Sequence, residues 1–358
     1  MKLPELRIGK LVAKYPIIQG GMGVGVSRSN LAGTVAACGG VGVISTAQIG
    51  FDEPDFQTNT KEANLRSLAK HIKKAKEIAG GNGIVGINIM CVLNNYVEQV
   101  KTAIEAGIDL IISGAGLPKQ LPEYVKGSKV KIAPIISSAR GAVLMTKMWI
   151  TKHDYIPDMI VVEGPEAGGH LGFSKEELEA KEKDIYQIGE EVIKAIKPFE
   201  EKYQRKIPII LAGGIYTGRD IAKAINLGAA GVQMASRFVA TDECDAHENF
   251  KKAYIQATKE EIEIVQSPVG MPGRAIRNSF IKQVKDKPSR VTKCLNCIKT
   301  CEPAQTPYCI TQALINSVKG DVDNGLVFCG STTYRIKNIV PVKELMRELI
   351  TEAEIENK

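Results

Sequence analysis

The sequence has few aromatic residues and no long apolar run, and both absences narrow the class of protein. Phe, Tyr and Trp make up 5% of the 358 residues, with a single Trp. The longest apolar runs have the length of a β-strand, which excludes a membrane-spanning helix. The net charge of +7 is scattered rather than gathered in basic blocks, so nucleic acid is not an expected partner.

The sequence also lacks export and disulfide signals. Residues 1–18 contain no continuous apolar stretch of the kind found in a signal peptide. Eight cysteines in a chain of this length do not indicate a disulfide framework. We therefore expect a cytoplasmic protein that acts on a small molecule, with no membrane partner. A homodimer remains an open alternative, because nothing in the sequence determines the oligomeric state.

Glycine and short apolar runs are what the sequence has in quantity. There are 34 glycines, and apolar residues make up 44% of the chain. Eight near-continuous apolar runs alternate with amphipathic stretches, as expected of strands covered on both faces. These runs are residues 15–22, 41–46, 84–90, 109–116, 131–138, 158–164, 207–214 and 231–238.

Strict alternation of eight strands with helices predicts an α/β fold, specifically a (β/α)8 TIM barrel. An open doubly wound sheet is the alternative. Residues 175–205 are predicted to form one extended sixth helix, and residues 341–350 the eighth barrel helix. Residues 260–323 then form a lid or cap inserted between strand 8 and helix 8. The predicted domains are a barrel at 1–259, a cysteine-containing cap at 260–323 and a returning segment at 324–358.

Polar and glycine residues gather where the predicted strands end. Gly213 and Gly214 end the seventh strand, before Thr217 and Asp220, which can cap the next helix. Ala235 and Ser236 end the eighth. Glycine lets backbone N–H groups approach an anion, and barrels often bind phosphate with the loops after strands seven and eight. A phosphate site is favoured over a simple tight turn.

Four histidines are present, and His170 differs from the others in its setting. It follows Gly168 and Gly169 at the end of the sixth strand, whereas His71, His153 and His247 are expected at the surface. A near-neutral pKa suits an imidazole to proton abstraction. We therefore interpret His170 as a catalytic base rather than a structural residue.

Four cysteines lie within sixteen residues, at Cys294, Cys297, Cys301 and Cys309. Their spacing matches neither the common zinc pairs nor the ferredoxin run well. Metal binding by this group stays open, and we assign no metal ligand. Cys38, Cys91, Cys244 and Cys329 are expected to be small core residues.

Five glycine-containing or polar segments at the predicted strand ends resemble the nitronate monooxygenase family of FMN-dependent barrels. This family was formerly called 2-nitropropane dioxygenase. That family includes flavin-type enoyl-ACP reductases and certain NAD(P)H:quinone reductases. The matching pieces are residues 16–22 (PIIQGGM), 86–88 (GIN), 163–170 (EGPEAGGH), 212–215 (AGGI) and 233–236 (QMAS). They span nearly the whole barrel, and the EAGGH core is quite specific.

The resemblance implies an FMN site and a role for each matching residue. His170 would be the catalytic base. Many relatives have glutamine where this chain has Glu163, and a carboxylate there would disfavour an anionic reduced ring. The residues predicted to bind the cofactor are Gly20, Gly21, Met22, Asn88, Ser137, Glu163, Gly168, Gly169, Gly213, Gly214, Gln233, Met234, Ala235 and Ser236.

The resemblance implies two activities on one scaffold. The first is oxidation of alkyl nitronates with O2 to carbonyl compounds and nitrite. The second is reduction of FMN by NAD(P)H, followed by reduction of a quinone or an enoyl-ACP. The flavin would supply the electron chemistry in both. Two alternatives lie outside this family: an iron–sulfur or metal electron-transfer protein centred on the four cysteines, and a flavin-free barrel that binds a sugar phosphate.

Overall fold

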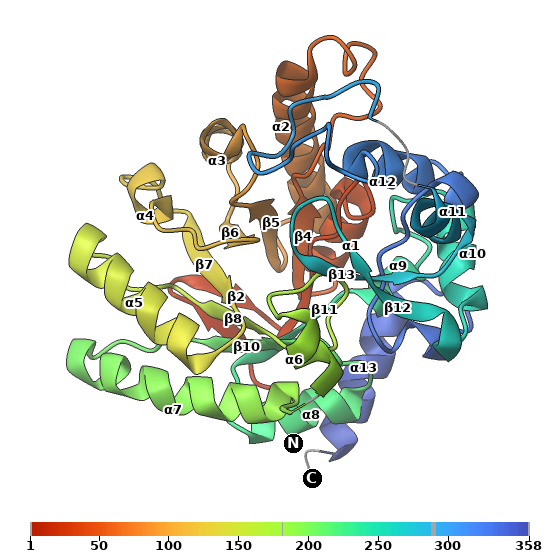
Figure 1. Cartoon of the computed structure of the whole chain (residues 1–358). Helices are drawn as coiled ribbons and strands as arrows, with labels where there is room; N and C mark the ends of the chain where they lie inside the picture. The colour runs from red at the N-terminus through yellow and green to blue at the C-terminus, as the bar shows by residue number, and fades with distance from the viewer. Residues whose placement is uncertain (1, 181, 288–290, 357–358) are drawn as a thin grey trace.

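The computed structural model describes residues 2–180, 182–287 and 291–356 and contains a closed barrel of parallel strands (Figure 1). The predicted barrel is therefore confirmed, and each expected apolar run contains one barrel strand. In their order around the barrel the strands are β10 (Ile209–Ala212), β11 (Gly231–Met234), β3 (Ile17–Gln19), β4 (Val41–Ser45), β5 (Ile84–Met90), β6 (Leu110–Gly114), β7 (Lys131–Ile136) and β8 (Ile160–Glu163).

Helices surround the barrel and cover the outer face of each strand (Figure 1). They are α1 (Ser29–Ala37), α2 (Thr60–Ala79), α3 (Tyr96–Glu105), α4 (Leu121–Tyr124), α5 (Ala139–His153), α7 (Ile185–Tyr203), α8 (Gly218–Asn226) and α13 (Val342–Glu356). The main core lies between strands and helices and includes the fully buried Trp149. None of the helices in the described part of the chain is long and apolar enough to cross a membrane.

A hairpin that the sequence did not reveal closes the N-terminal end of the barrel. It consists of β1 (Leu6–Ile8) and β2 (Leu11–Ala13), paired antiparallel. Leu6 and Ile8 are fully buried and pack on apolar side chains of the barrel interior, including Val43. Because this end is filled with apolar side chains, a polar ligand is expected at the opposite, C-terminal mouth.

The prediction of one extended helix over residues 175–205 was wrong. The described residues form two helices, α6 (Lys175–Ala180) and α7. The Asp184 side chain accepts the N–H of Gln187, and the Gln187 side chain accepts the N–H of Asp184. This capping box starts a new helix and so divides the predicted single helix in two. The composition of the segment alone does not reveal it.

The chain after β11 forms two short helices and then a small sheet near the barrel mouth. The elements are α9 (Ser236–Val239), α10 (Glu248–Gln256), η1 (Lys259–Glu261), β12 (Ile262–Gln266), β13 (Pro272–Ile276), α11 (Ser279–Asp286), α12 (Ile310–Val318), η2 (Val322–Asn324) and η3 (Thr333–Arg335). β13 pairs with both β12 and β9 (Gly169–His170), which lies between β8 and α6.

The last helix completes the ring, because α13 packs against α8 and α1. It begins where the sequence predicted and continues to Glu356, six residues further than expected. The division into barrel, cap and returning segment stays a prediction. Residues 1, 181, 288–290 and 357–358, which fall within those ranges, lie outside the described residues.

Candidate active site

A cavity of about 420 Å³ lies at the C-terminal ends of the barrel strands, and we call it the mouth cavity. Every residue predicted for the site lines it, although these residues come from many separate strand ends. The set is Gly20, Gly21, Met22, Asn88, Ser137, Glu163, Gly168, Gly169, His170, Gly213, Gly214, Gln233, Met234, Ala235 and Ser236. Their individual roles toward a cofactor stay predictions.

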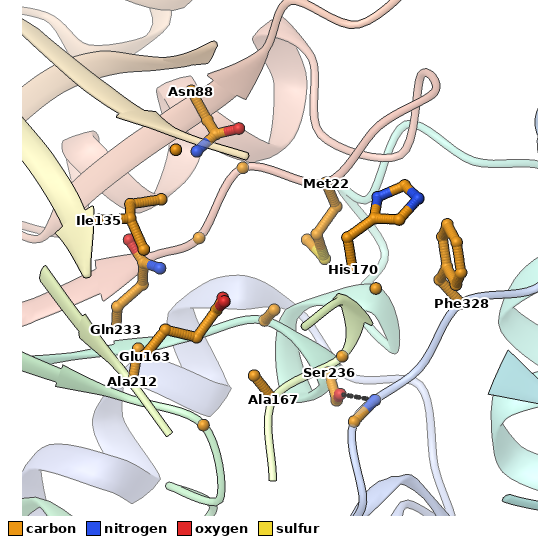
Figure 2. Close-up of a pocket in the computed structure, with 18 of the residues that line it drawn as sticks. Met22, Asn88, Ile135, Glu163, Ala167, His170, Ala212, Gln233, Ser236 and Phe328 are labelled. Carbon is orange, nitrogen blue, oxygen red and sulfur yellow. Dashed lines mark hydrogen bonds between the residues drawn. The ribbon is translucent and has the colours of Figure 1, made fainter. Parts of the chain in front are cut away.

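One side of the mouth cavity is built by close packing of the loop after β3 against β5. Gly21 lies so near the side chain of Asn88 that a β-carbon at position 21 would overlap its Cβ atom. The glycine therefore lets the main chain pass directly beside Asn88. Met22 projects from the same loop toward His170, as Figure 2 shows.

Another side is formed by the glycine pair after β10. Gly213 and Gly214 have φ values of +89° and +88°, in the left-handed region that favours glycine. A β-carbon on Gly213 would lie 2.9 Å from the backbone nitrogen of Ala167. Both conformation and space therefore require glycine here, which leaves backbone N–H groups accessible to an anion.

The start of helix α8 does not share in this anion site. The predicted cap is present: Thr217 accepts the N–H of Asp220, and the Asp220 carboxylate accepts the N–H groups of Tyr216 and Thr217. That carboxylate already neutralises the positive helix end. A phosphate must therefore rely on the loop glycines and on Ala235 and Ser236 at the start of α9. Ser236 Oγ accepts the N–H of Gly330 at 3.1 Å (Figure 2).

Three polar side chains reach the mouth cavity from three different strands. Asn88 lies on β5, two residues before its end, Glu163 ends β8 and Gln233 lies on β11 (Figure 2). None of the three side chains has a hydrogen bond to another residue that the structure describes. Burial raises the pKa of the Glu163 carboxyl to about 7, because the charged form loses hydration. Such unpartnered groups are expected to bind ligand atoms.

His170 occupies the wall of the mouth cavity on β9. Its Nε2 atom lies 2.7 Å from the hydroxyl of Ser267, and its ring meets the ring of Phe328 edge-on, with 4.9 Å between the centroids. Burial lowers the pKa of His170 to about 4. The imidazole is therefore neutral at physiological pH and can accept a proton. Its Nδ1 atom has no hydrogen bond to a described residue, which makes Nδ1 the candidate base.

The other histidines are more enclosed than expected in two cases. His71 and His153 are half-buried, whereas His247 is exposed. The Nδ1 atom of His71 lies 2.9 Å from Ser29 Oγ, and burial lowers the pKa of His71 to about 4. The prediction of a surface position was wrong for His71, because the lysine-rich helix that carries it also packs on a neighbouring segment, whereas His153 makes an exposed hydrogen bond to Lys119 O.

Several residues that complete the site were missed in the sequence. Met271, from the turn between β12 and β13, and Phe328, from the segment after η2, line the cavity, whereas Ser267 of the same turn contacts His170 without lining it. Arg237 also lines the cavity and is paired with Glu348 at 2.9 Å. Ser267, Met271 and Phe328 follow β11 by 30 residues or more, in a region without a recognisable motif. No local signal could therefore have placed them at the site.

None of the four clustered cysteines lines the mouth cavity, although Cys297 lines a small adjoining pocket that also contains His170. The thiols of Cys301 and Cys309 help to raise the pKa of Cys297, which shows that they lie near one another. No group of three or more His, Cys, Asp or Glu side chains among the described residues is arranged to hold a metal ion. Of the four cysteines expected in the core, Cys244 and Cys329 are buried.

Cys38 and Cys91 are only half-buried, although both pack against the main core as predicted. Cys38 follows α1, and Cys91 follows the mouth end of β5. Each follows the last residue of a helix or strand, where neighbouring segments cover the side chain only in part.

The fold and the cavity define a (β/α)8-barrel protein with a ligand site at the C-terminal mouth. The model of the nitronate monooxygenase family matches residues 5–352, so the chain belongs to that family and is an FMN-dependent oxidoreductase. A probable nitronate monooxygenase of Staphylococcus saprophyticus is 27% identical over 306 residues, which cover 80% of this chain and 82% of that protein.

Solved structures are similar over almost the whole chain. FabK from Thermotoga maritima has a TM-score of 0.74 and 25% identity, covering 96% of this chain and 94% of its own. A nitroalkane oxidase from Streptomyces ansochromogenes has a TM-score of 0.71 and 18% identity, covering 95% and 96%. The second likeness shows the fold alone.

The residues of the mouth cavity fit FMN on two observations. The left-handed glycines at 213 and 214 line the cavity with main chain that carries no side chain, as close approach of a phosphate to backbone N–H groups requires. The side chains of Asn88, Glu163 and Gln233 present amide and carboxyl groups without partners among the described residues. These match the needs of a ring with several hydrogen-bonding atoms.

Proposed function

We propose that the protein oxidises alkyl nitronates with O2 to carbonyl compounds and nitrite. The observation that carries the proposal is the neutral imidazole of His170 in the wall of the mouth cavity, with Nδ1 unpartnered among the described residues. The similarity to the Staphylococcus saprophyticus protein supports the same activity. FMN, when bound, supplies the electron transfer.

The residues of the site have distinct parts in this proposal. Gly213, Gly214 and Ser236 hold the phosphate, and Gly21 and Asn88 border the ring. His170 Nδ1 takes the proton from the carbon of a neutral nitroalkane, or orients a nitronate that is already ionised. Ser267 holds Nε2 and so sets the direction of the ring. Phe328 and Met271 cover the cavity from the side of the β12–β13 turn and exclude water.

A second candidate is reduction of a quinone or an enoyl-ACP with NAD(P)H as co-substrate. The observation that favours it is the similarity to FabK from Thermotoga maritima, which extends over 96% of this chain. In that reaction His170 would orient the substrate rather than protonate it, because burial keeps the imidazole neutral.

Anaerobic stopped-flow reduction distinguishes the two candidates. The FMN-loaded protein is mixed with an alkyl nitronate, with NADH or with NADPH, and loss of the oxidised flavin absorbance is followed. We expect rapid bleaching by the nitronate. Rapid bleaching by a nicotinamide nucleotide and none by the nitronate would instead support the second candidate.

A pair of variants tests the base. His170→Ala is expected to retain FMN and to lose most of its activity toward neutral nitroalkanes. His153→Ala is the matched control, since His153 contacts Lys119 O at 2.9 Å and does not line the mouth cavity. Unchanged turnover by His170→Ala would show that the base lies elsewhere.

A further inference from the structure

Glu163 is an ionisable group that lines the mouth cavity and has no hydrogen-bond or ion-pair partner among the described residues. It ends β8 and stands opposite Ala212 of β10 in the sheet register. Figure 2 shows its carboxyl directed into the cavity, with Ile135 on the adjacent strand β7 and Gln233 on β11, one strand beyond β10. Its side chain makes no hydrogen bond or ion pair with any residue in the described part of the chain.

Among the described residues, no charged side chain contributes to the pKa of Glu163. The labelled side chains that Figure 2 shows beside it from β7, β10 and β11 are Ile135, Ala212 and Gln233, none of which ionises. Burial alone raises the pKa of Glu163 to about 7, without a contribution from a charged neighbour. At physiological pH the carboxyl is therefore close to half protonated and can gain or lose a proton easily.

His170 and Cys329, two other titratable groups of the mouth cavity, each keep one protonation state at equilibrium near neutral pH, which a transient proton on His170 during turnover does not alter. His170 is neutral because burial lowers its pKa to about 4, and Arg237 is already paired with Glu348. Burial raises the pKa of Cys329 to about 12, so this thiol keeps its proton. The remaining titratable groups that line the cavity are Glu166, Tyr216 and Tyr254.

We infer that Glu163 takes up a proton when the bound cofactor is reduced and so balances the negative charge that reduction places in the barrel. Two electrons enter from the reductant, one proton from the reductant or solvent goes to the ring, and one proton from solvent goes to the Glu163 carboxylate. The net charge of the cavity is then the same before and after reduction. The like-charge repulsion that a fixed carboxylate would cause is removed.

The inference rests on the proposed placement of FMN in the mouth cavity, but not on the identity of the substrate. It assigns Glu163 a direct role toward the cofactor and explains how a carboxyl can occupy a position next to an electron-rich ring. Glutamine at the same position could donate a hydrogen bond but could not take up a proton.

Redox titration tests the inference without any turnover. The FMN-loaded wild type, Glu163→Gln and the control Glu166→Gln are equilibrated anaerobically with dithionite and indicator dyes from about pH 6 to about pH 9, which brackets the pKa of Glu163. Glu166 is a carboxyl of the same cavity, in a loop that also lines it. Oxidised flavin absorbance first confirms that each protein holds FMN.

The expected result is a difference in the pH dependence of the midpoint potential. Above about pH 7 the potential of the wild type should fall more steeply than that of Glu163→Gln by about 30 mV per pH unit, since one more proton accompanies two electrons. Glu166→Gln should follow the wild type. Equal slopes for the wild type and Glu163→Gln would overturn the inference.

A measurement on the wild type alone covers the case in which Glu163→Gln does not fold or bind FMN. The reduced-minus-oxidised infrared difference spectrum at about pH 8, above the pKa of Glu163, should gain a protonated carboxyl C=O band. Absence of that band would also overturn the inference. Failure of nitronate to reduce the protein would contradict the proposed substrate but leave both of these results unaffected. Loss of FMN from all three proteins would instead contradict the placement of the cofactor in the mouth cavity.

Discussion

Replacement of Ser267 by alanine tests whether the turn between β12 and β13 positions the base. Ser267 is buried, with an exposed fraction of 2%, and its hydroxyl lies 2.7 Å from His170 Nε2. The same oxygen accepts the N–H of Val269 at 3.3 Å. The variant therefore removes the polar contact that holds the imidazole ring, and it also removes one hydrogen bond of the turn.

The size of the effect follows from the burial of this contact. Loss of a buried hydrogen bond costs about 1 kcal/mol, and a buried group left without a partner costs up to about 3 kcal/mol. If this free energy is lost from the transition state, kcat/KM for a neutral nitroalkane falls between about fivefold and about a hundredfold. The free energy of unfolding should fall by about 1 kcal/mol.

The assay is kcat/KM as a function of pH on protein that retains FMN. The acidic limb of the Ser267→Ala profile should shift to lower pH, because the protonated ring loses an acceptor for its Nε2–H. Ser267→Thr keeps the hydroxyl and should restore most of the activity and the position of the limb. An alanine variant with full kcat/KM and an unshifted limb would refute the assigned role of Ser267.

Three further predictions follow from other parts of the molecule. Gly214→Ala should weaken FMN binding about tenfold in a fluorescence titration, because left-handed strain of about 1–2 kcal/mol displaces the backbone N–H groups. Gly107→Ala, with φ of +81° and open space around it, is the control that should bind FMN normally. Asp158→Asn should lower the free energy of unfolding by about 3 kcal/mol, measured in urea, because the fully buried carboxylate side chain accepts from Arg205 at 2.7 Å and from the N–H of Ile132. FMN affinity unchanged by Asp158→Asn would agree with its place far from the cavity, and unchanged stability would contradict the prediction. Without FMN, the wild type should lose stability relative to Glu163→Gln as the pH rises from about 4.5 to about 7, since the pKa of Glu163 is raised in the folded protein. The loss in the free energy of unfolding is at most about 3 kcal/mol, because the cavity hydrates the carboxyl in part. Parallel pH curves for these two proteins would show that Glu163 ionises normally.

The pH dependence of stability that Glu163 causes can be distinguished from the one that His170 causes. The folded pKa of His170 is lowered to about 4, so its contribution to stability is lost as the pH falls below about 6.5. This contribution is present in both proteins and cancels in their difference. Only the change at Glu163 remains, and it has the opposite direction.

The barrel could be predicted from the sequence because its signals are local. Each strand is a short apolar run covered on both faces, such as residues 84–90, and glycine or polar residues lie at or near the end of each run. Parallel strands in a closed barrel direct all these ends to one rim. The gathering of Gly21, Glu163 and Gly214 in one cavity therefore follows from the strand order alone, once the barrel is assumed.

The tertiary structure decided which distant segments complete the site. His170 and Ser267 are 97 positions apart, and their contact depends on the pairing of β9 with β13. The pKa values of Glu163 and His170 also depend on burial, and burial depends on how the segment after β11 covers the mouth. A local pattern determines strand and helix periodicity, whereas desolvation and hydrogen bonding depend on neighbours that the sequence does not place. The sequence thus determined the rim and its glycines. Only the fold determined that the His170 imidazole is neutral, that Ser267 contacts it and that Glu163 has no partner among the described residues.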